Sequence, residues 1–366
     1  MSQDKKYTSI HYSSYLGLEK ILDAQHPRSA QLGKEAHEEM LFIIIHQVYE
    51  LWFRQILHEV DSVMKMFASD KVDEKNIDVA VSRLERVNEI LKLLIQQIKV
   101  LETMTPLDFL DFRGYLFPAS GFQSFQFRKL EVMLGLKIEK RISYTPHAYY
   151  KEFSEEQQTE IQKHETASSL FDLIEAWLER TPFLQMDEFD FKSKYMQAVN
   201  NMLQRERDAI QSSDYLSEHE KAMRLKMNGD TDNYFANIFN PDFHAQQIAE
   251  GKMRISFKAA MAALLIHLYG SEPLLQLPCR LLNTITEMDE LLTNWRYRHA
   301  QMVMRMLGRK SGTGGSSGHE YLMDTVKKHQ IFIDFHNIST LLIPRSELPE
   351  LPQSMKKMLG FYFNQQ

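Results

Sequence analysis

The sequence predicts an all-α protein, and three observations support this class. Its 366 residues include only 14 glycines and 11 prolines, well below the roughly 12 % that these two residue types usually contribute together. Apolar residues recur mostly at spacings of three and four, the period of an amphipathic helix. No stretch alternates persuasively between apolar and polar residues, as a half-buried strand does. We therefore expect a compact helical protein, with residues 1–366 forming a single domain.

The first long helix is predicted to run from Ser29, whose side chain suits an N-cap, to about Phe67. One stripe of this helix is apolar and predicts a buried face, formed by Leu41, Ile44, Ile45, Val48, Leu51 and Trp52. A second stripe carries Phe42, His46, Tyr49 and Phe53. Further helices are predicted at about 75–104, 122–135, 166–180, 189–212, 217–228, 255–269 and 274–307. The polar segment at about 142–165 is predicted to be a surface excursion between helices.

Charge, hydropathy and cysteine content exclude several classes of partner and site. Lys and Arg number 43 against 49 Asp and Glu, so the net charge of −6 offers no general attraction to a nucleic acid. No apolar run approaches the roughly 20 residues that span a bilayer, and the opening "MSQDKKYTSI" lacks a secretory apolar stretch. We therefore expect a cytoplasmic protein with no membrane or nucleic-acid partner. Cys279 is the only cysteine, which excludes an intramolecular disulfide, a thiolate-rich zinc site and an iron–sulfur cluster.

The fourteen histidines do not form the usual metal-binding motifs. None has a glutamate three residues before it, as a di-iron helical bundle requires. The string "HEEML" at His37 lacks the second histidine of a zinc peptidase. Any metal is therefore expected to be held by other His or carboxylate arrangements, or to arrive inside a cofactor.

Two histidines stand out because each lies in mid-helix on a face made of large apolar residues. His46 shares its face with Phe42 and Phe53. The face of His299 also carries Trp295, Met302, Val303 and Met306. Each histidine is compatible with a core position satisfied by a hydrogen bond. The pair is also compatible with a haem pocket, which needs apolar surroundings and one axial nitrogen ligand.

Two further segments allow a ligand-binding interpretation and a structural one. Arg113 stands among the aromatic residues Phe109, Phe112, Tyr115, Phe117 and Phe122. It can extend to solvent from an apolar segment, or it can bind a substrate carboxylate through two charge-assisted hydrogen bonds. The string "GTGGSSG", residues 312–318, can be a flexible connector. It can also let backbone N–H groups and the Thr313 hydroxyl approach a ligand closely.

Six stretches, in this order, resemble the tryptophan 2,3-dioxygenase family over nearly the whole chain. They are "YSSYLGLEKILDAQHP", "HEEMLFIIIHQVYELWFRQILHE", "LDFLDFRGYLFPASGFQSFQFRKLE", "LLTNWRYRH", "GTGGSSGHEYL" and "NISTLLIPRSELP". The resemblance implies an all-α fold that binds haem b, with ferrous iron for activity, and a homotetramer built as a dimer of dimers. It also implies insertion of O2 into the indole C2–C3 bond of L-tryptophan to give N-formyl-L-kynurenine, the first step of the kynurenine pathway.

The resemblance assigns roles to individual residues. It implies that His299 is the axial haem ligand, that His46 binds the indole N–H, and that Arg113 binds the substrate carboxylate. Thr313 is expected to contact the substrate's amino and carboxylate groups. Residues expected to line the substrate pocket are Phe42, Phe109, Leu116 and Ser120, and those expected beside the haem are Trp295 and Ser120. An N-terminal segment of about residues 1–28 is expected to enter the pocket of a neighbouring subunit through Tyr12, Tyr15 and Leu16.

Two other functions remain open at the level of sequence. A relative on the same fold could hydroxylate a tyrosine-like substrate with peroxide, and a non-catalytic haem protein could bind O2. The set of anchoring residues fits tryptophan, however, and a non-catalytic carrier would leave Arg113 and Thr313 without an evident task.

Overall fold

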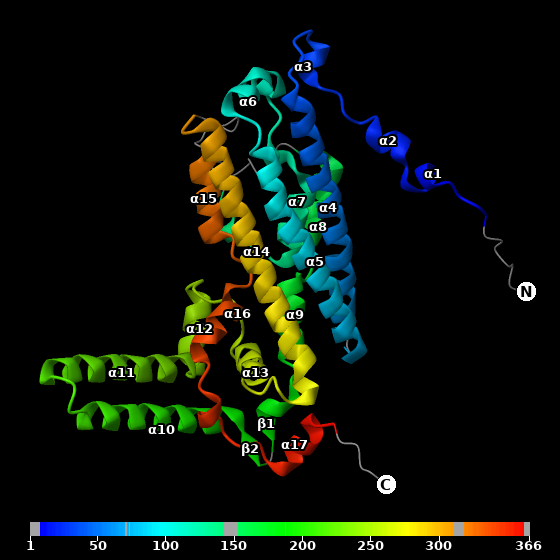
Figure 1. Cartoon of the computed structure of the whole chain (residues 1–366). Helices are drawn as coiled ribbons and strands as arrows, with labels where there is room; N and C mark the ends of the chain where they lie inside the picture. The colour runs from blue at the N-terminus through cyan, green and yellow to red at the C-terminus, as the bar shows by residue number, and fades with distance from the viewer. Residues whose placement is uncertain are drawn as a thin grey trace, which may run out of the picture.

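The computed structural model of the chain describes residues 8–69, 72, 74–142, 153–186, 188–310 and 318–361. Within these ranges the chain is helical apart from one small ribbon (Figure 1). The ribbon consists of β1 (Gln185–Met186) and β2 (Phe189–Asp190), which pair antiparallel. The predicted all-α class is therefore confirmed.

Three long helices from distant parts of the sequence lie side by side. Helix α5 (Glu74–Leu101) packs against both α4 (Glu38–Phe67) and α14 (Gln276–Leu307). Other helices cover this layer: α7 (Phe125–Leu134) and α9 (Leu170–Leu178) pack on α4, and α15 (Gly318–Lys328) packs on α14. The two histidines singled out in the sequence, His46 and His299, therefore lie on long helices of the same layer.

Most of the remaining helices lie beside this layer or below it, and α6 lies at its upper end in Figure 1. The remaining helices are α6 (Pro106–Arg113), α8 (Glu155–Thr166), α10 (Phe191–Ser212), α11 (Glu218–Ile238), α12 (Pro241–Ala249), α13 (Phe257–Leu268), α16 (Ile333–Asn337) and α17 (Gln353–Leu359). In Figure 1, α10 and α11 project from the body as an antiparallel pair. Helix α11 continues ten residues beyond the predicted end at 228, because Arg207 of α10 bonds the Asn228 side chain at 2.6 Å and Phe235 is buried.

The start of the first long helix differs from the prediction. Ser29 lies in the short helix α3 (Arg28–Gln31), and α4 begins only at Glu38. Gly33 separates the two with a φ of 71°, a left-handed conformation that suits glycine. The buried Ser29 hydroxyl accepts from the Ala36 backbone N–H at 2.9 Å rather than capping α4. The prediction that Ser29 is the N-cap of the long helix was therefore wrong.

The buried face of α4 is also rotated relative to the predicted stripe. Its buried apolar residues are Ile45, Phe53, Ile56, Val60, Val63 and Phe67. Ile44 and Leu51 are 42 % and 51 % exposed, because no described element of this chain covers that side of the helix. In the second stripe Phe53 is buried, Phe42 and Tyr49 are half-buried, and His46 is exposed.

The segment predicted as a surface excursion, at about 142–165, contains a helix in its described part. The Ser154 side chain and Gln157 form a capping box that starts α8, with Gln157 N donating to Ser154 Oγ at 3.2 Å. Ile161 of α8 and Phe153 before it are buried and cluster with Val132 of α7. This part of the segment is therefore packed against the body of the protein.

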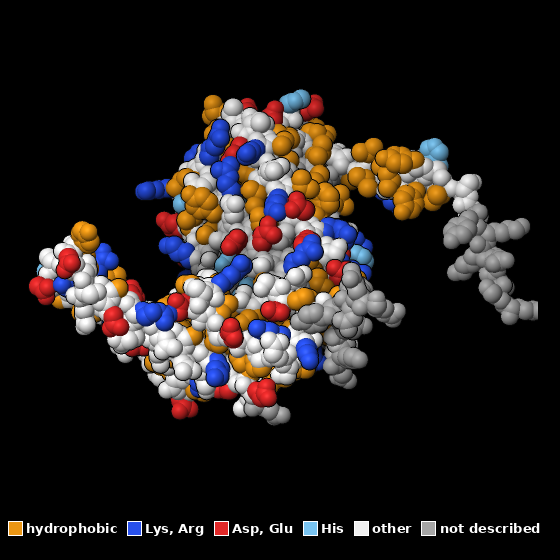
Figure 2. Space-filling view, turned by 60° about the horizontal axis from the view of Figure 1, so that its bottom comes forward, with side chains coloured by type: hydrophobic (Ala, Val, Ile, Leu, Met, Phe, Trp, Pro, Cys, Tyr) orange, Lys and Arg blue, Asp and Glu red, His pale blue; other side chains and the backbone are white. Residues whose placement is uncertain are grey.

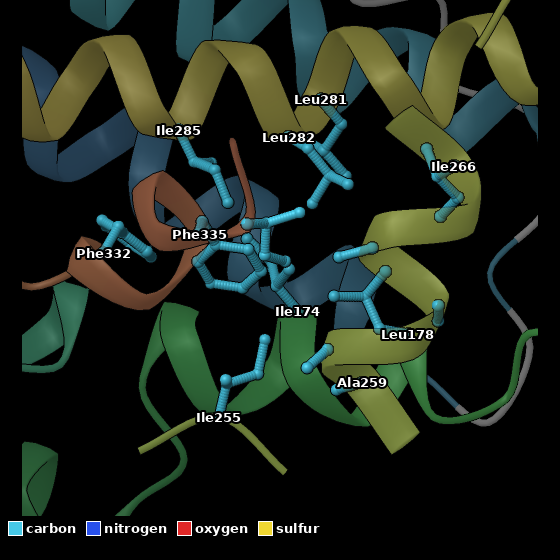
Figure 3. Packing of buried hydrophobic residues seen from close by; sticks show 14 of the residues in the cluster. Ile174, Leu178, Ile255, Ala259, Ile266, Leu281, Leu282, Ile285, Phe332 and Phe335 are labelled. Carbon is cyan, nitrogen blue, oxygen red and sulfur yellow. The ribbon is translucent and has the colours of Figure 1, made fainter. Parts of the chain in front are cut away.

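The main apolar core lies where α9, α13, α14 and α16 meet. Figure 3 shows Ile174 and Leu178 of α9 directed toward Ile285 and Phe335 across this interior. Nearly every residue of α13 is buried, which matches its all-round apolar sequence "FKAAMAALLIHL". Across the described ranges, no helix combines the length and the apolar character needed to cross a membrane.

A buried network of charged groups joins three of the helices around the histidines. Glu131 of α7 accepts from Arg296 Nη2 of α14 at 3.0 Å and from Arg128 Nη1 at 2.8 Å. His329, just after α15, donates from Nδ1 to Glu131 at 3.1 Å, and its backbone carbonyl accepts from Arg296. Burial alone would raise the pKa of Glu131, but Arg128, the His329 hydrogen bond and Arg296 hold the pKa well below its usual range. Arg296, one turn before His299, is thereby fixed relative to α7.

Candidate active site

His46 is held in one tautomer by its own helix. Its Nδ1 lies 2.6 Å from the carbonyl oxygen of Phe42, one turn earlier on α4. Because a carbonyl only accepts, Nδ1 carries the proton and Nε2 of the neutral ring keeps its lone pair. Part of the ring reaches solvent, but the surrounding protein removes enough water to lower the pKa of His46. The hydrogen bond to the Phe42 carbonyl and the negative charge of Glu50 act in the opposite direction. At neutral pH, His46 can therefore accept an N–H through Nε2.

His299 is a neutral ring on α14 with an available lone pair. Burial lowers its pKa to about 4, and repulsion from a charge on His46 is the second cause. The two rings are thus close enough for the charge of one to disfavour the charge of the other. Among the described residues, no hydrogen bond engages the His299 ring. A neutral imidazole of this kind can ligate a metal.

Aromatic rings from four helices surround the two histidines. Phe42 packs against the His46 ring at 4.1 Å between centroids and against Phe109 of α6 at 5.7 Å. Trp295 lies 5.5 Å from the His299 ring and 5.0 Å from Phe127 of α7. The apolar residues packed around this part of α4, α6 and α14 include Ile45, Phe112, Leu116, Met302 and Met306. The arrangement suits a flat, apolar ligand held by one nitrogen.

Arg113 occupies the end of α6, next to this aromatic group. Helix α6 starts with a capping box in which Thr105 and Asp108 bond each other, and Pro106 takes the first helical position. Phe112 is fully buried, so it anchors the end of the helix, and Arg113 beside it is half-buried. Arg113 therefore ends a helix that is fixed at both ends, and a guanidinium can bind a carboxylate through two charge-assisted hydrogen bonds.

Ser120 lies in the connection between α6 and α7. Its Oγ accepts from the Phe122 backbone N–H at 3.4 Å and so caps the 3₁₀ turn Gly121–Gln123. Its own N–H donates to the Gln123 side chain at 3.2 Å. These bonds fix the conformation of the chain that joins Arg113 to α7.

The predicted site residues fall into three groups in the structure. One group is brought together around the two histidines: Phe42, His46, Phe109, Leu116, Trp295 and His299. Arg113 ends α6, and Ser120 lies in the segment that joins α6 to α7. Thr313 lies outside the described residues.

The third group, Tyr12, Tyr15 and Leu16, is separated from the other site residues within this chain. These residues form α1 (Tyr12–Leu16), which is followed by α2 (Leu18–Leu22), and neither helix buries a residue. Gly17, with a φ of 64°, separates α1 from α2. We call residues 8–23 the N-terminal arm. Figures 1 and 2 show the arm extending away from the body with its apolar side chains uncovered.

Two residues next to the site were not found by sequence reasoning. Phe127 packs on Trp295, and Glu50 lies one turn beyond His46 on the same helix. Both contribute through the contact of α4 with α7, which no local sequence pattern reveals. The only available signal was that Glu50 extends the stripe of His46 at a spacing of four.

The described residues contain no group of three or more His, Cys, Asp and Glu side chains that could hold a metal ion. A metal at this site would therefore depend on His299 and on ligands that the protein does not supply. One neutral imidazole among aromatic side chains fits a haem, whose macrocycle supplies four nitrogen ligands.

Comparisons with known proteins point to one family. A family model described as tryptophan 2,3-dioxygenase matches residues 2–342. The tryptophan 2,3-dioxygenase of Bdellovibrio bacteriovorus is 50 % identical over 358 residues, which cover 98 % of this chain and 100 % of the relative. The enzyme of that name from Dictyostelium discoideum is 45 % identical over 353 residues, 96 % of this chain and 88 % of the relative. Tryptophan 2,3-dioxygenase B of Danio rerio is 43 % identical over 350 residues, 95 % of this chain and 86 % of the relative.

Proposed function

The chain belongs to the tryptophan 2,3-dioxygenase family, and on this basis we propose that it converts L-tryptophan and O2 to N-formyl-L-kynurenine. Both oxygen atoms enter the product, so the reaction consumes no external electron donor. The observation that carries the proposal is the pair of histidines, His46 on α4 and His299 on α14. Each packs against an aromatic ring, and a charge on His46 would lower the pKa of His299. The tyrosine hydroxylase and carrier alternatives are not favoured by the relatives.

We propose that haem b binds through His299, with Trp295 and Ser120 beside it. Ferrous haem, when bound, supplies the binding and activation of O2. The protein must then hold the substrate's indole ring and its amino-acid end in fixed positions. His46 accepts the indole N–H through Nε2, and Arg113 binds the carboxylate. Phe42, Phe109 and Leu116 contact the ring, and Thr313 contacts the amino and carboxylate groups.

We also propose that the chain forms a homotetramer, a dimer of dimers in which each N-terminal arm completes the site of a neighbouring subunit. The exposure of Tyr12 and Tyr15, 70 % and 72 %, supports this because their own subunit leaves them uncovered. The base of the arm is tied to α4 next to His46: Gln47 donates to the Ala24 carbonyl at 3.0 Å and accepts from Gln25 at 2.6 Å. The arm therefore leaves the body near the site.

The direct test of the function uses purified protein with haem in the ferrous state. We expect L-tryptophan and O2 to be consumed in equal amounts, with formation of the absorbance of N-formylkynurenine. A ferrous protein with a normal Soret band that consumed no tryptophan would contradict the proposed reaction. A protein with no capacity for haem would contradict the cofactor as well.

For His46→Ala we expect retained haem and a modest loss of tryptophan affinity. The variant loses one neutral hydrogen bond to the indole N–H, which corresponds to about 2- to 10-fold in the dissociation constant. The control ligand is 1-methyltryptophan, which has no indole N–H, so its affinity should be nearly the same in both proteins. Complete inactivity with unchanged tryptophan affinity would instead show that His46 is an obligatory base.

For Arg113→Leu we expect tryptophan binding to weaken by about 10- to 100-fold, the equivalent of one charge-assisted hydrogen bond. The loss should be smaller for tryptamine, which lacks the carboxylate. Binding can be measured by titrating the haem absorbance of each protein. Arg345→Leu, which removes an exposed arginine remote from the site, should leave both affinities unchanged. Equal losses for tryptophan and tryptamine would rule out a carboxylate clamp.

A further inference from the structure

Glu50 joins the helix of His46 to the start of α7 through three hydrogen bonds. Its Oε1 accepts from the Ser124 hydroxyl at 2.6 Å. The Gln126 side-chain amide donates to Glu50 Oε2 at 2.8 Å and to the Glu50 backbone carbonyl at 2.8 Å. Gln126 thus uses both of its N–H hydrogens on one residue of α4. Glu50 lies one turn beyond His46 and is close enough to influence its charge.

Ser124 is itself part of the fold of the adjoining segment. Its Oγ accepts from the Phe127 backbone N–H at 3.3 Å, so the hydroxyl that bonds Glu50 also caps α7. The Ser124 backbone N–H donates to the Gly121 carbonyl at 3.2 Å, and Ser120 bonds the Gln123 side chain. The position of Ser120 therefore depends on the position of Ser124. Arg113, the last residue of α6, lies directly before this connection.

We propose that Glu50 and Gln126 are positioning residues that hold the segment of residues 113–124 in fixed register with the His46 turn of α4. This inference rests on the proposed function, in which His46 binds the indole end of the substrate and Arg113 binds the carboxylate. One substrate molecule can reach both His46 and Arg113 only if α4 and the segment of residues 113–124 keep their relative position. Glu50 and Gln126 therefore act on tryptophan binding without touching the substrate.

The chain offers a matched control for a purely structural role. Gln97 of α5 donates from its side-chain amide to the carbonyl of Ile45 at 3.1 Å, on the same turn of α4 as His46. Like Gln126, it is a half-buried glutamine that ties α4 to a neighbouring helix. Unlike Gln126, it does not bond Glu50, the residue that accepts from Ser124 at the end of the segment of residues 113–124. Gln97→Leu and Gln126→Leu therefore each remove one side-chain amide that bonds α4 near His46, the first from α5 and the second from α7.

The experiment compares haem content, melting temperature and ligand dissociation constants of the two variants and the unaltered holoenzyme. For Gln126→Leu we expect unchanged haem content and about a tenfold weaker binding of L-tryptophan, with KM raised similarly and kcat largely retained. Tryptamine, which lacks the carboxylate anchor, should lose less affinity than L-tryptophan. For Gln97→Leu we expect a similar change in melting temperature and unchanged affinity for both ligands.

Two results would overturn the proposal: unchanged tryptophan affinity in Gln126→Leu, or an equal loss in Gln97→Leu. If Gln126→Leu does not fold, Glu50→Gln provides the second test, because it keeps one side-chain acceptor and the backbone carbonyl. It should weaken tryptophan binding by a smaller factor, again more than tryptamine binding, and equal factors for the two ligands would overturn the inference. Failure of the proposed function would be recognised separately, because the unaltered holoenzyme itself would then not bind or convert L-tryptophan.

Discussion

His299→Ala is expected to abolish stable haem binding, and with it the dioxygenase activity. The ring is the only imidazole on the His299 face of α14, where its neighbours are Trp295, Val303 and two methionines, whose thioethers are weaker ligands. Loss of residues that merely support a metal ligand costs about 10- to 100-fold in metal affinity, so loss of the ligand itself should cost at least about 100-fold. The measurement is the ratio of the Soret absorbance to the protein absorbance after purification.

Two controls separate ligation from general damage. His244 is a buried histidine whose Nε2 bonds the Ile255 carbonyl at 2.8 Å, away from the two site histidines. His244→Ala should lower the melting temperature and keep the haem, whereas His299→Ala should lose the haem. Adding imidazole to His299→Ala should restore part of the Soret band, because the free ligand can occupy the space of the deleted ring. A His299→Ala protein with unchanged spectra and activity would remove His299 from the mechanism.

The sequence predicted which helices carry the two histidines better than it predicted the packing around those helices. Spacing of three and four was enough to place His46 and His299 on apolar helix faces. It could not show that these faces meet, because the two helices are far apart in sequence and pack on a third helix, α5. The resemblance to the family supplied that pairing, and the effect of His46 on the pKa of His299 supports it.

The errors in element boundaries have local physical causes. Gly33 interrupts the first predicted long helix because it takes a left-handed conformation, which spacing of apolar residues does not reveal. Ile44 and Leu51 fit an apolar stripe but are exposed, since periodicity marks an apolar face and does not show what covers it. The buried contacts of Glu131 with Arg296 and His329 join residues from distant parts of the chain, so only the folded structure could disclose them.

The exposure of the N-terminal arm leads to the last prediction, which concerns sharing of sites between subunits. If the arm of one subunit completes the site of another, a chain lacking Tyr15 and a chain lacking Arg113 should complement each other. Each site contains its own subunit's Arg113 and the neighbour's Tyr15. In a pair of one Tyr15→Ala chain and one Arg113→Leu chain, one site therefore has both residues intact and the other has neither.

When equal amounts of the two chains reassort at random, about half of the arm-exchanging pairs are mixed. One of the two sites in each mixed pair is intact, so about a quarter of all sites should be fully intact. We therefore expect activity to rise from nearly none in either variant alone to about a quarter of the unaltered enzyme's activity in the mixture. Differently tagged chains allow subunit exchange to be confirmed by mass. A mixture of Arg113→Leu and Arg113→Ala chains is the control and should remain inactive. Confirmed exchange without recovered activity would mean that each site is built from one chain. In that case every site of a mixed pair would still carry one of the two defects.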